Sequence, residues 1–244
     1  MHKSVHRMLG RTRAIALSAA LLSGAALPAA GLWAGNASAA PLLKLPSKTT
    51  LSSSRDPSFF GQPVTFTAVV APLGIGIFDG HGTVGFKNGS FSIPGCSSQS
   101  LHFILGSWRA FCTTGALPAG LHTIRATYSG DSHWFGSTKT LTQVVLRAPT
   151  HLRANIFFNF RQTFTVTGTL DSFRRPVAHE PLIFRTGHTF LCVAFTNSRG
   201  VGACLLSYAR SVAIRQNAGR FTVIFPGSAN YLPSIAFGQG IIHP

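Results

Sequence analysis

The sequence predicts an all-β protein of two tandem β-sandwiches that follow an N-terminal signal peptide. Three observations lead to this fold class: strand-like alternation, turn residues between the strands, and an internal repeat. Apolar and small polar residues alternate in residues 64–70, 121–128, 138–145, 164–170 and 221–225. This period of two, with many Thr, Val and Phe residues, indicates half-buried antiparallel strands.

Turn signals separate these strands at Asp79-Gly80, Asn88-Gly89, Ser129-Gly130 and Pro226-Gly227. No segment after residue 40 keeps a 3.6-residue period, so the sequence predicts no helix there. Short strands at this spacing predict about seven strands in each sandwich.

The repeat has an offset near 100 residues. GQPVTFTAVV (61–70) matches RQTFTVTGTL (161–170), and GTVGFKNG (82–89) matches EPLIFRTG (180–187). AGLHTIRATYSGDSHWFGS (119–137) matches AGRFTVIFPGSANYLPS (218–234). A period of this length indicates two domains, which we place at residues 49–146 and 150–242. A leader, 40–48, precedes them, and Pro149 stiffens the short junction between them.

Residues 1–39 have the pattern of a signal peptide. A basic start precedes the apolar run 14–35, and Ala37-Ser38-Ala39 offers a small-residue cleavage site. The sequence therefore predicts cleavage near Ala39 and a secreted or cell-surface protein. The alternative is a retained membrane anchor, because the apolar run is long enough to span a bilayer.

The four cysteines lie in the exported part as two close pairs, one in each repeat. We expect disulfides Cys96–Cys112 and Cys192–Cys204, although four cysteines allow three connectivities. Zinc is disfavoured because no C-x-x-C or H-x-x-x-H motif accompanies them. We expect no metal and no cofactor.

Positive charge dominates the composition. The chain has 21 Lys and Arg against 5 Asp and Glu, and cleavage leaves 17 against 5, a net charge of +12. This predicts attraction to an anionic cell-envelope polymer, a lipid surface or a polysaccharide. We expect neither a specific nucleic acid nor a small-molecule substrate as partner, and the oligomeric state is not predicted. The candidate contacts are Arg153, Arg174, Arg175, Arg185, Arg199, Arg210, Arg215 and Arg220.

The segment 120–137 holds the residue types of a catalytic triad, in Ser132, His122 or His133, and Asp131. In the repeat alignment, however, His122 stands opposite Phe221 and Asp131 opposite Ser228. A fold that works with either set does not need the chemistry, so we predict no catalytic residue. We expect turn roles instead for Gly120, Gly130, Asp131, Gly219, Gly227 and Ser228.

Two phenylalanine-rich segments, 58–60 and 157–160, precede the second strand of each repeat. We expect them to cap the two cores, and exposed contact points are the alternative.

Residues 49–146 resemble a bacterial Ig-like domain of group 3. The resemblance rests on TTLSSSRDPSFFGQPVTFTAVVAP, GTVGFKNG and ALPAGLHTIRATYSGDSHWFGSTKTLTQVV. Residues 150–242 resemble the same family more loosely, through Ala218-Gly219, Pro226-Gly227 and Asn230-Tyr231. The resemblance implies a surface or secreted protein with no shared catalytic residues. We therefore expect an exported, non-enzymatic binding or adhesion module; a structural spacer is the alternative, and a secreted enzyme is a third reading.

Overall fold

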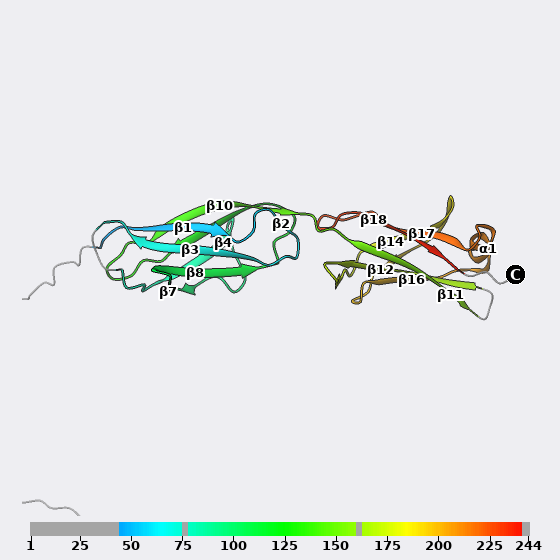
Figure 1. Cartoon of the computed structure of the whole chain (residues 1–244), viewed down its shortest axis with the longest axis horizontal. Helices are drawn as coiled ribbons and strands as arrows, with labels where there is room; N and C mark the ends of the chain where they lie inside the picture. The colour runs from blue at the N-terminus through cyan, green and yellow to red at the C-terminus, as the bar shows by residue number, and fades with distance from the viewer. Residues whose placement is uncertain (1–43, 75–77, 160–162, 241–244) are drawn as a thin grey trace, which may run out of the picture. The chain divides into compact units, whose positions relative to one another are not determined.

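The computed structural model describes residues 44–74, 78–159 and 163–240. The predicted signal peptide, its cleavage site near Ala39 and residues 40–43 of the leader lie outside these ranges. Each half of the described chain is two layers of strands, as Figure 1 shows. We name them sandwich 1 (residues 45–146) and sandwich 2 (residues 148–240). Each has its own hydrophobic core, so the predicted all-β, two-sandwich fold class is confirmed.

Sandwich 1 has two sheets whose strands are antiparallel, apart from the parallel pair β2–β10. The first sheet has the order β1-β3-β8-β7, and the second has the order β2-β10-β9-β4-β5, with β6 also paired to β4. This is the four-on-three arrangement of immunoglobulin constant-type sandwiches with short strands added. The bounds are β1 (Ser47–Ser53), β2 (Ser58–Phe59), β3 (Val64–Pro72), β4 (Thr83–Asn88), β5 (Phe91–Ser92), β6 (Gln99–Ser100), β7 (His102–Ile104), β8 (Ser107–Thr114), β9 (Gly120–Tyr128) and β10 (Ser137–Leu146).

Alternation in the sequence becomes alternation in burial. In β9, residues 122, 124, 126 and 128 are buried while the residues between them are exposed. The largest fully buried side chains between the two sheets include Phe66, Phe86, Tyr128 and Trp134. Burying each apolar side chain of this size contributes about 1.5–3 kcal/mol.

Sandwich 2 repeats the plan with fewer strands. One sheet has the order β11-β12-β13 with β16 also paired to β12, and the other has the order β15-β14-β17-β18. The bounds are β11 (His151–Asn159), β12 (Thr163–Ser172), β13 (Arg175–Pro176), β14 (Pro181–Thr186), β15 (Thr189–Phe195), β16 (Val201–Leu205), β17 (Arg220–Phe225) and β18 (Ser234–Gln239).

The prediction of a helix-free chain is wrong at one place. A helix, α1 (Tyr208–Gln216), connects β16 to β17, whereas only residues 115–119 connect the equivalent strands β8 and β9. Its two buried residues are Ser211 and Ile214, so the helix is too short for a 3.6-residue period to show in the sequence. Tertiary contacts hold it: the Ser211 hydroxyl accepts the backbone N–H of Phe164 at 3.1 Å.

The paired region of each sandwich begins before the first predicted strand. Leu45 forms a parallel bridge with Trp134, and Ala148 forms the equivalent bridge with Tyr231. Leu45 donates to and accepts from the backbone on either side of Trp134, and Ala148 does the same around Tyr231, at 2.8–2.9 Å. Residues assigned from the sequence to the leader and to the junction are thus paired with the two sandwiches.

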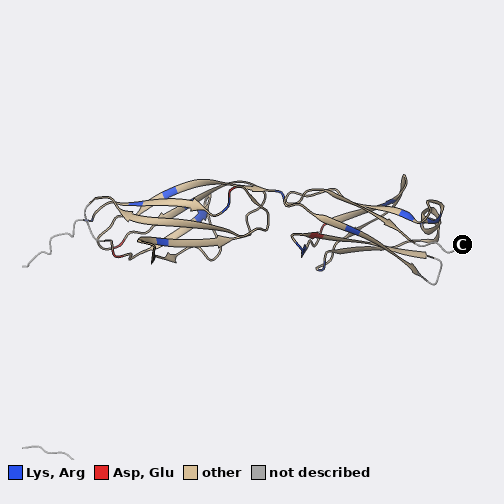
Figure 2. Cartoon of the chain, in the orientation of Figure 1, with Lys and Arg blue, Asp and Glu red and all other residues tan. Residues whose placement is uncertain are grey.

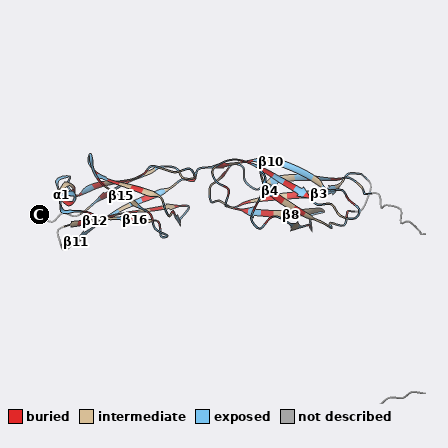
Figure 3. Cartoon of the chain, turned by 180° about the vertical axis from the view of Figure 1, so that it is seen from behind, coloured by how far each residue is buried: buried red, intermediate tan, exposed pale blue. Residues whose placement is uncertain are grey.

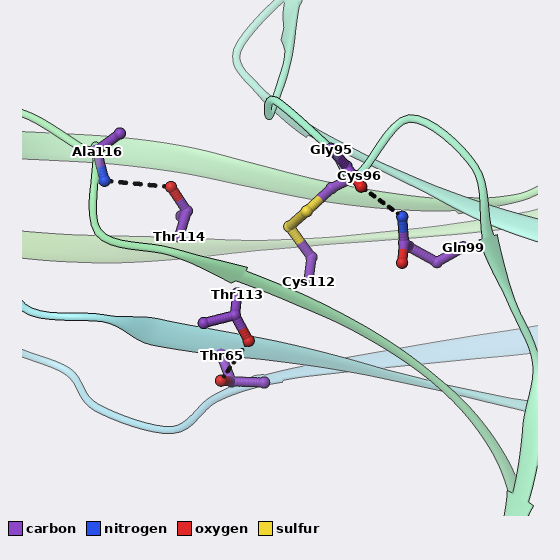
Figure 4. Close-up of a disulfide and its surroundings, with 8 residues drawn as sticks. All are labelled: Thr65, Gly95, Cys96, Gln99, Cys112, Thr113, Thr114 and Ala116. Carbon is purple, nitrogen blue, oxygen red and sulfur yellow. Dashed lines mark hydrogen bonds between the residues drawn. A yellow bond between two sulfur atoms is a disulfide. The ribbon is translucent and has the colours of Figure 1, made fainter.

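Each sandwich contains one disulfide, in the pairing that the cysteine spacing predicts. Figure 4 shows Cys96, in the loop after β5, joined to Cys112 on β8. The backbone of Cys96 accepts the N–H of Phe86, so this bond links the β4 side of the sandwich to the opposite sheet. Cys192 on β15 and Cys204 on β16 make the corresponding link in sandwich 2.

Candidate binding surface

Asp131 organises the turn between β9 and β10. Its Oδ1 accepts the backbone N–H groups of His133 and Trp134, each at 2.8 Å, and its Oδ2 accepts the Tyr128 hydroxyl at 2.8 Å. This is the geometry of an Asx turn. Burial alone would raise the pKa of Asp131, but the hydrogen bonds from Tyr128 and the two amides outweigh it and lower that pKa. Burial, and after it the hydrogen bond to Asp131, raises the pKa of Tyr128.

The carboxylate therefore binds a phenol and backbone amides rather than a histidine ring. The Ser132 hydroxyl lies 3.0 Å from His133 Nδ1, and both side chains are exposed. A triad needs an acid that orients the histidine ring, whereas both carboxylate oxygens of Asp131 accept hydrogen bonds from Tyr128 and the turn amides. The arrangement favours a structural role for the segment.

His122 is buried and fully hydrogen-bonded. Its Nε2 lies 2.7 Å from the Pro118 carbonyl, which can only accept, so Nε2 carries the proton. Its Nδ1 then accepts from the Asn88 amide at 3.0 Å. The buried ring joins β4 to the start of β9.

The strand register changes one part of the repeat alignment. Tyr128 pairs with Ser137, and Phe225 pairs with Ser234, at the same point before equivalent turns. Counting back along β9 and β17 then places Phe221 opposite Ile124 rather than opposite His122. The strand β17 begins at Arg220, the position equivalent to Thr123 of β9, so Ala218-Gly219 does not occupy the place of Ala119-Gly120.

The turn residues of sandwich 2 differ in one respect from expectation. Gly219 and Gly227 have positive φ, as Gly120 and Gly130 do, which glycine adopts without strain. The backbone N–H of Ser228 bonds to the Tyr231 carbonyl, but its hydroxyl donates to Glu180 at 2.9 Å instead of to the turn.

The predicted arginines do not lie on one element. Arg153 on β11 bonds to Asp171 at 3.3 Å, while Arg174 and Arg175 lie at the β12–β13 turn. Arg199 is in the β15–β16 loop, and Arg210 and Arg215 are on α1. Figure 2 shows basic residues spread over both sandwiches.

Arg185 and Arg220 are the exception. Arg185 pairs with Thr222, two residues along β17 from Arg220, so the two exposed arginines are diagonal neighbours on one sheet face. A shallow groove of about 590 Å³ adjoins Arg220, with Asn217, Phe237 and Gln239 in its lining.

The expectation that both phenylalanine segments cap the cores holds for one of them. Phe60 packs against the core of sandwich 1. Phe157 and Phe158 lie on β11 and are more than half exposed, and the Arg215 guanidinium stands 5.8 Å from the Phe158 ring centroid. Phe160 lies outside the described residues.

Sequence reasoning missed a set of exposed apolar side chains on the β15–β14–β17–β18 sheet. Figure 3 shows that exposed residues alternate with buried ones along the strands of sandwich 2. The members are Phe190, Val193, Phe195, Ile235 and Phe237. A sequence signal was present: Leu182-Ile-Phe184 and Val223-Ile-Phe225 are consecutive apolar residues, a pattern typical of strands covered on both faces.

Neither a metal cluster nor a membrane-crossing helix emerges from the part of the chain that the structure describes. Within it, no three His, Cys, Asp or Glu side chains gather as metal ligands. Its helix is also too short and too polar to cross a bilayer.

Comparison with known families finds a match to sandwich 1. Residues 50–146 match the family model described as bacterial Ig-like domain (group 3). Members of this family are typically non-enzymatic. A search of curated proteins finds no match to the chain.

Solved structures match the chain only at low similarity. A 1.5-MDa bacterial ice-binding adhesin is 14% identical with a TM-score of 0.30, over 81% of this chain and 64% of that one. An Escherichia coli adhesin is 16% identical with a TM-score of 0.29, over 79% and 64%. Tandem Ig domains of titin are 7% identical with a TM-score of 0.28, over 79% and 97%. This chain thus spans less than two thirds of either adhesin chain, and scores this low carry no functional inference.

Proposed function

Because residues 50–146 match the family model of the bacterial Ig-like domain (group 3), we propose that the chain is an exported, non-enzymatic module that binds an anionic polymer of the cell envelope or its surroundings. The observation that carries the proposal is positive charge that the protein's own acids do not neutralise. Two disulfides fit an oxidising, extracellular setting.

The five acids are engaged locally. Asp56 accepts the Val144 N–H at 2.9 Å, Asp131 holds its turn, and Glu180 accepts from Ser228. Asp79 bonds to a histidine, and Asp171 to Arg153 and a histidine. Positive charge elsewhere on the surface is therefore left for an external partner, which it attracts over about one Debye length, 8 Å at physiological salt.

Among the eight predicted arginines, the diagonal neighbours Arg185 and Arg220 are the local candidate for the contact. Like charges near each other across strands destabilise a sheet slightly, and a bound carboxylate or phosphate would reverse that cost. Guanidinium groups suit such anions because they donate two parallel hydrogen bonds.

The spread of the other six arginines over β11, β13, two loops and α1 favours the second candidate, a structural spacer. A spacer needs a stable sandwich and no ligand. Bulk charge would then give only weak, salt-sensitive adhesion.

The test is retention of the exported protein on cell-wall fragments, anionic lipid and an acidic polysaccharide across a salt series. The variant Arg185→Ser/Arg220→Ser is compared with Lys87→Ser/Arg125→Ser, which removes the same charge from the rival cationic pair on the neighbouring strands β4 and β9 of sandwich 1. Binding at the sandwich 2 pair predicts retention on one target above 0.15 M salt, lost at least tenfold more in the first variant. Equal losses of retention for the two variants on all three targets would overturn the binding proposal in favour of the structural spacer.

A further inference from the structure

The outer face of the β15–β14–β17–β18 sheet carries an apolar row that crosses all four strands. Val193 pairs with Ile183, Ile183 with Ile224, and Ile224 with Ile235. Paired residues share a face, and their neighbours Leu182, Phe184 and Val223 fill the core, so this row points outward.

Phenylalanines flank the row on both sides. Phe195, beside Pro181, is 68% exposed, and Phe190 and Phe237, in the register row that holds Arg185 and Thr222, are 47% and 81% exposed. Only Arg185 and Arg220 bring charge to this face, and both lie toward the same end.

The same face of sandwich 1 is polar. Gly85 pairs with Thr127 where Ile183 pairs with Ile224, and Thr138 and Thr140 occupy the β10 positions of Ile235 and Phe237 on β18. The Thr138 hydroxyl even bonds to Thr127 across the strands at 3.3 Å. Sandwich 1 forms the same sheet with threonines at these positions, so the sheet itself does not call for isoleucine or phenylalanine there.

We propose that two copies of this chain dimerise by packing these outer sheet faces against each other. Sheets pack face to face about 10 Å apart with interdigitated side chains, and an apolar row through the middle of the face suits that packing. The inference does not depend on polyanion binding.

The area offered is enough for a specific interface. Taking about 200 Å² for each phenylalanine, the three partly exposed rings present about 400 Å². With Val193 and Ile235 each copy presents about 600 Å², so two copies bury about 1,200 Å², the lower end of the stable class. An apolar patch of this size is at the upper limit for a monomer.

The charges also permit a second copy. A two-fold axis through the isoleucine row turns one protomer end for end. Arg185 of one protomer then faces the end at Phe195 of the other, where a cation–π contact replaces like-charge repulsion. The net positive charge of each copy opposes association, so salt should strengthen the dimer while it weakens polyanion binding.

Sedimentation equilibrium of the exported protein, from about 1 to 100 µM, tests the proposal. That range brackets the micromolar dissociation constant expected of a small interface. The variant Ile235→Thr/Phe237→Thr installs the residues of sandwich 1, and Thr138→Ser/Thr140→Ser is the matched control. Both sites are exposed, so circular dichroism and thermal unfolding should match the wild type.

The expected result is a concentration-dependent dimer that strengthens with salt. The sandwich 2 variant should dissociate at least tenfold more readily, and the control should not differ from the wild type. A wild-type monomer at about 100 µM and high salt, or a sandwich 2 variant that dimerises equally well, would overturn the proposal. A monomer that binds neutral phosphatidylcholine vesicles through this face would also overturn it, in favour of a lipid surface.

Discussion

Replacing Asp131 by alanine should destabilise sandwich 1 alone. The carboxylate accepts two backbone N–H groups of its turn and the Tyr128 hydroxyl, all at 2.8 Å. This turn positions Trp134, whose side chain is 2% exposed at the end of the core. Without the carboxylate, two amides lose their acceptor and the tryptophan loses its support.

The size of the effect follows from these contacts. A carboxylate that caps backbone amides is worth about 1 kcal/mol at a helix start, and hydrogen bonds to charged groups reach about 1.5–3 kcal/mol. Tyr128 keeps a second acceptor, the His81 carbonyl at 2.7 Å. We therefore expect a loss of about 2 kcal/mol, which moves a urea midpoint by about 1–2 M.

Tryptophan fluorescence during urea unfolding isolates this event. Once the signal peptide is removed, the remaining tryptophans, Trp108 and Trp134, both lie in sandwich 1. Ser228→Ala is the matched control, because Ser228 stands at the equivalent turn of sandwich 2 and bonds to Glu180. It should leave the tryptophan transition unchanged.

The dependence on pH gives a second readout. The folded state lowers the pKa of Asp131 below its ordinary value, near 3.9 in unfolded chains. Its contribution is therefore complete above that value and is lost as the pH falls through it toward the folded pKa. The difference in unfolding free energy between wild type and Asp131→Ala should therefore be largest at neutral pH and should shrink below about pH 4. An unshifted midpoint, or a gap that stays constant down to about pH 3, would refute the assigned role.

Three further predictions concern other parts of the fold. Cys96→Ala/Cys112→Ala, which opens a loop of sequence separation 16, should lower the stability of sandwich 1 by about 3 kcal/mol in the same fluorescence assay; an unchanged midpoint in non-reducing buffer would contradict it. Ser211→Ala should cost about 1–3 kcal/mol in sandwich 2, because the buried N–H of Phe164 loses its acceptor, and tyrosine fluorescence or circular dichroism reports that transition. Gly200→Ala should cost more than about 1 kcal/mol, because φ is +75° and a Cβ would lie 2.4 Å from a backbone oxygen; equal stability to wild type would show that the loop relaxes without cost.

Local patterns were enough to predict the strands, the repeat and the cysteine pairing. In β9 and β12 the period of two in the sequence became a period of two in burial, because each strand has one face on the core. The helix α1 was not predicted, because only Ser211 and Ile214 face inward and two residues are too few to show a helical period. The exposure of Phe157 and Phe158 was also not predicted, because aromatic residues are assigned to the core when only their hydrophobicity is considered.

The sequence by itself determined the fold class and the count of repeats, since alternation and turn residues act between neighbours along the chain. Tertiary structure decided everything that depends on which residues face each other across strands. The Phe221–Ile124 correspondence, the diagonal pair Arg185 and Arg220, and the outward row through Ile183 and Ile224 all follow from register. A shift of one residue would reverse which face each side chain occupies, and only pairing between distant segments sets that register.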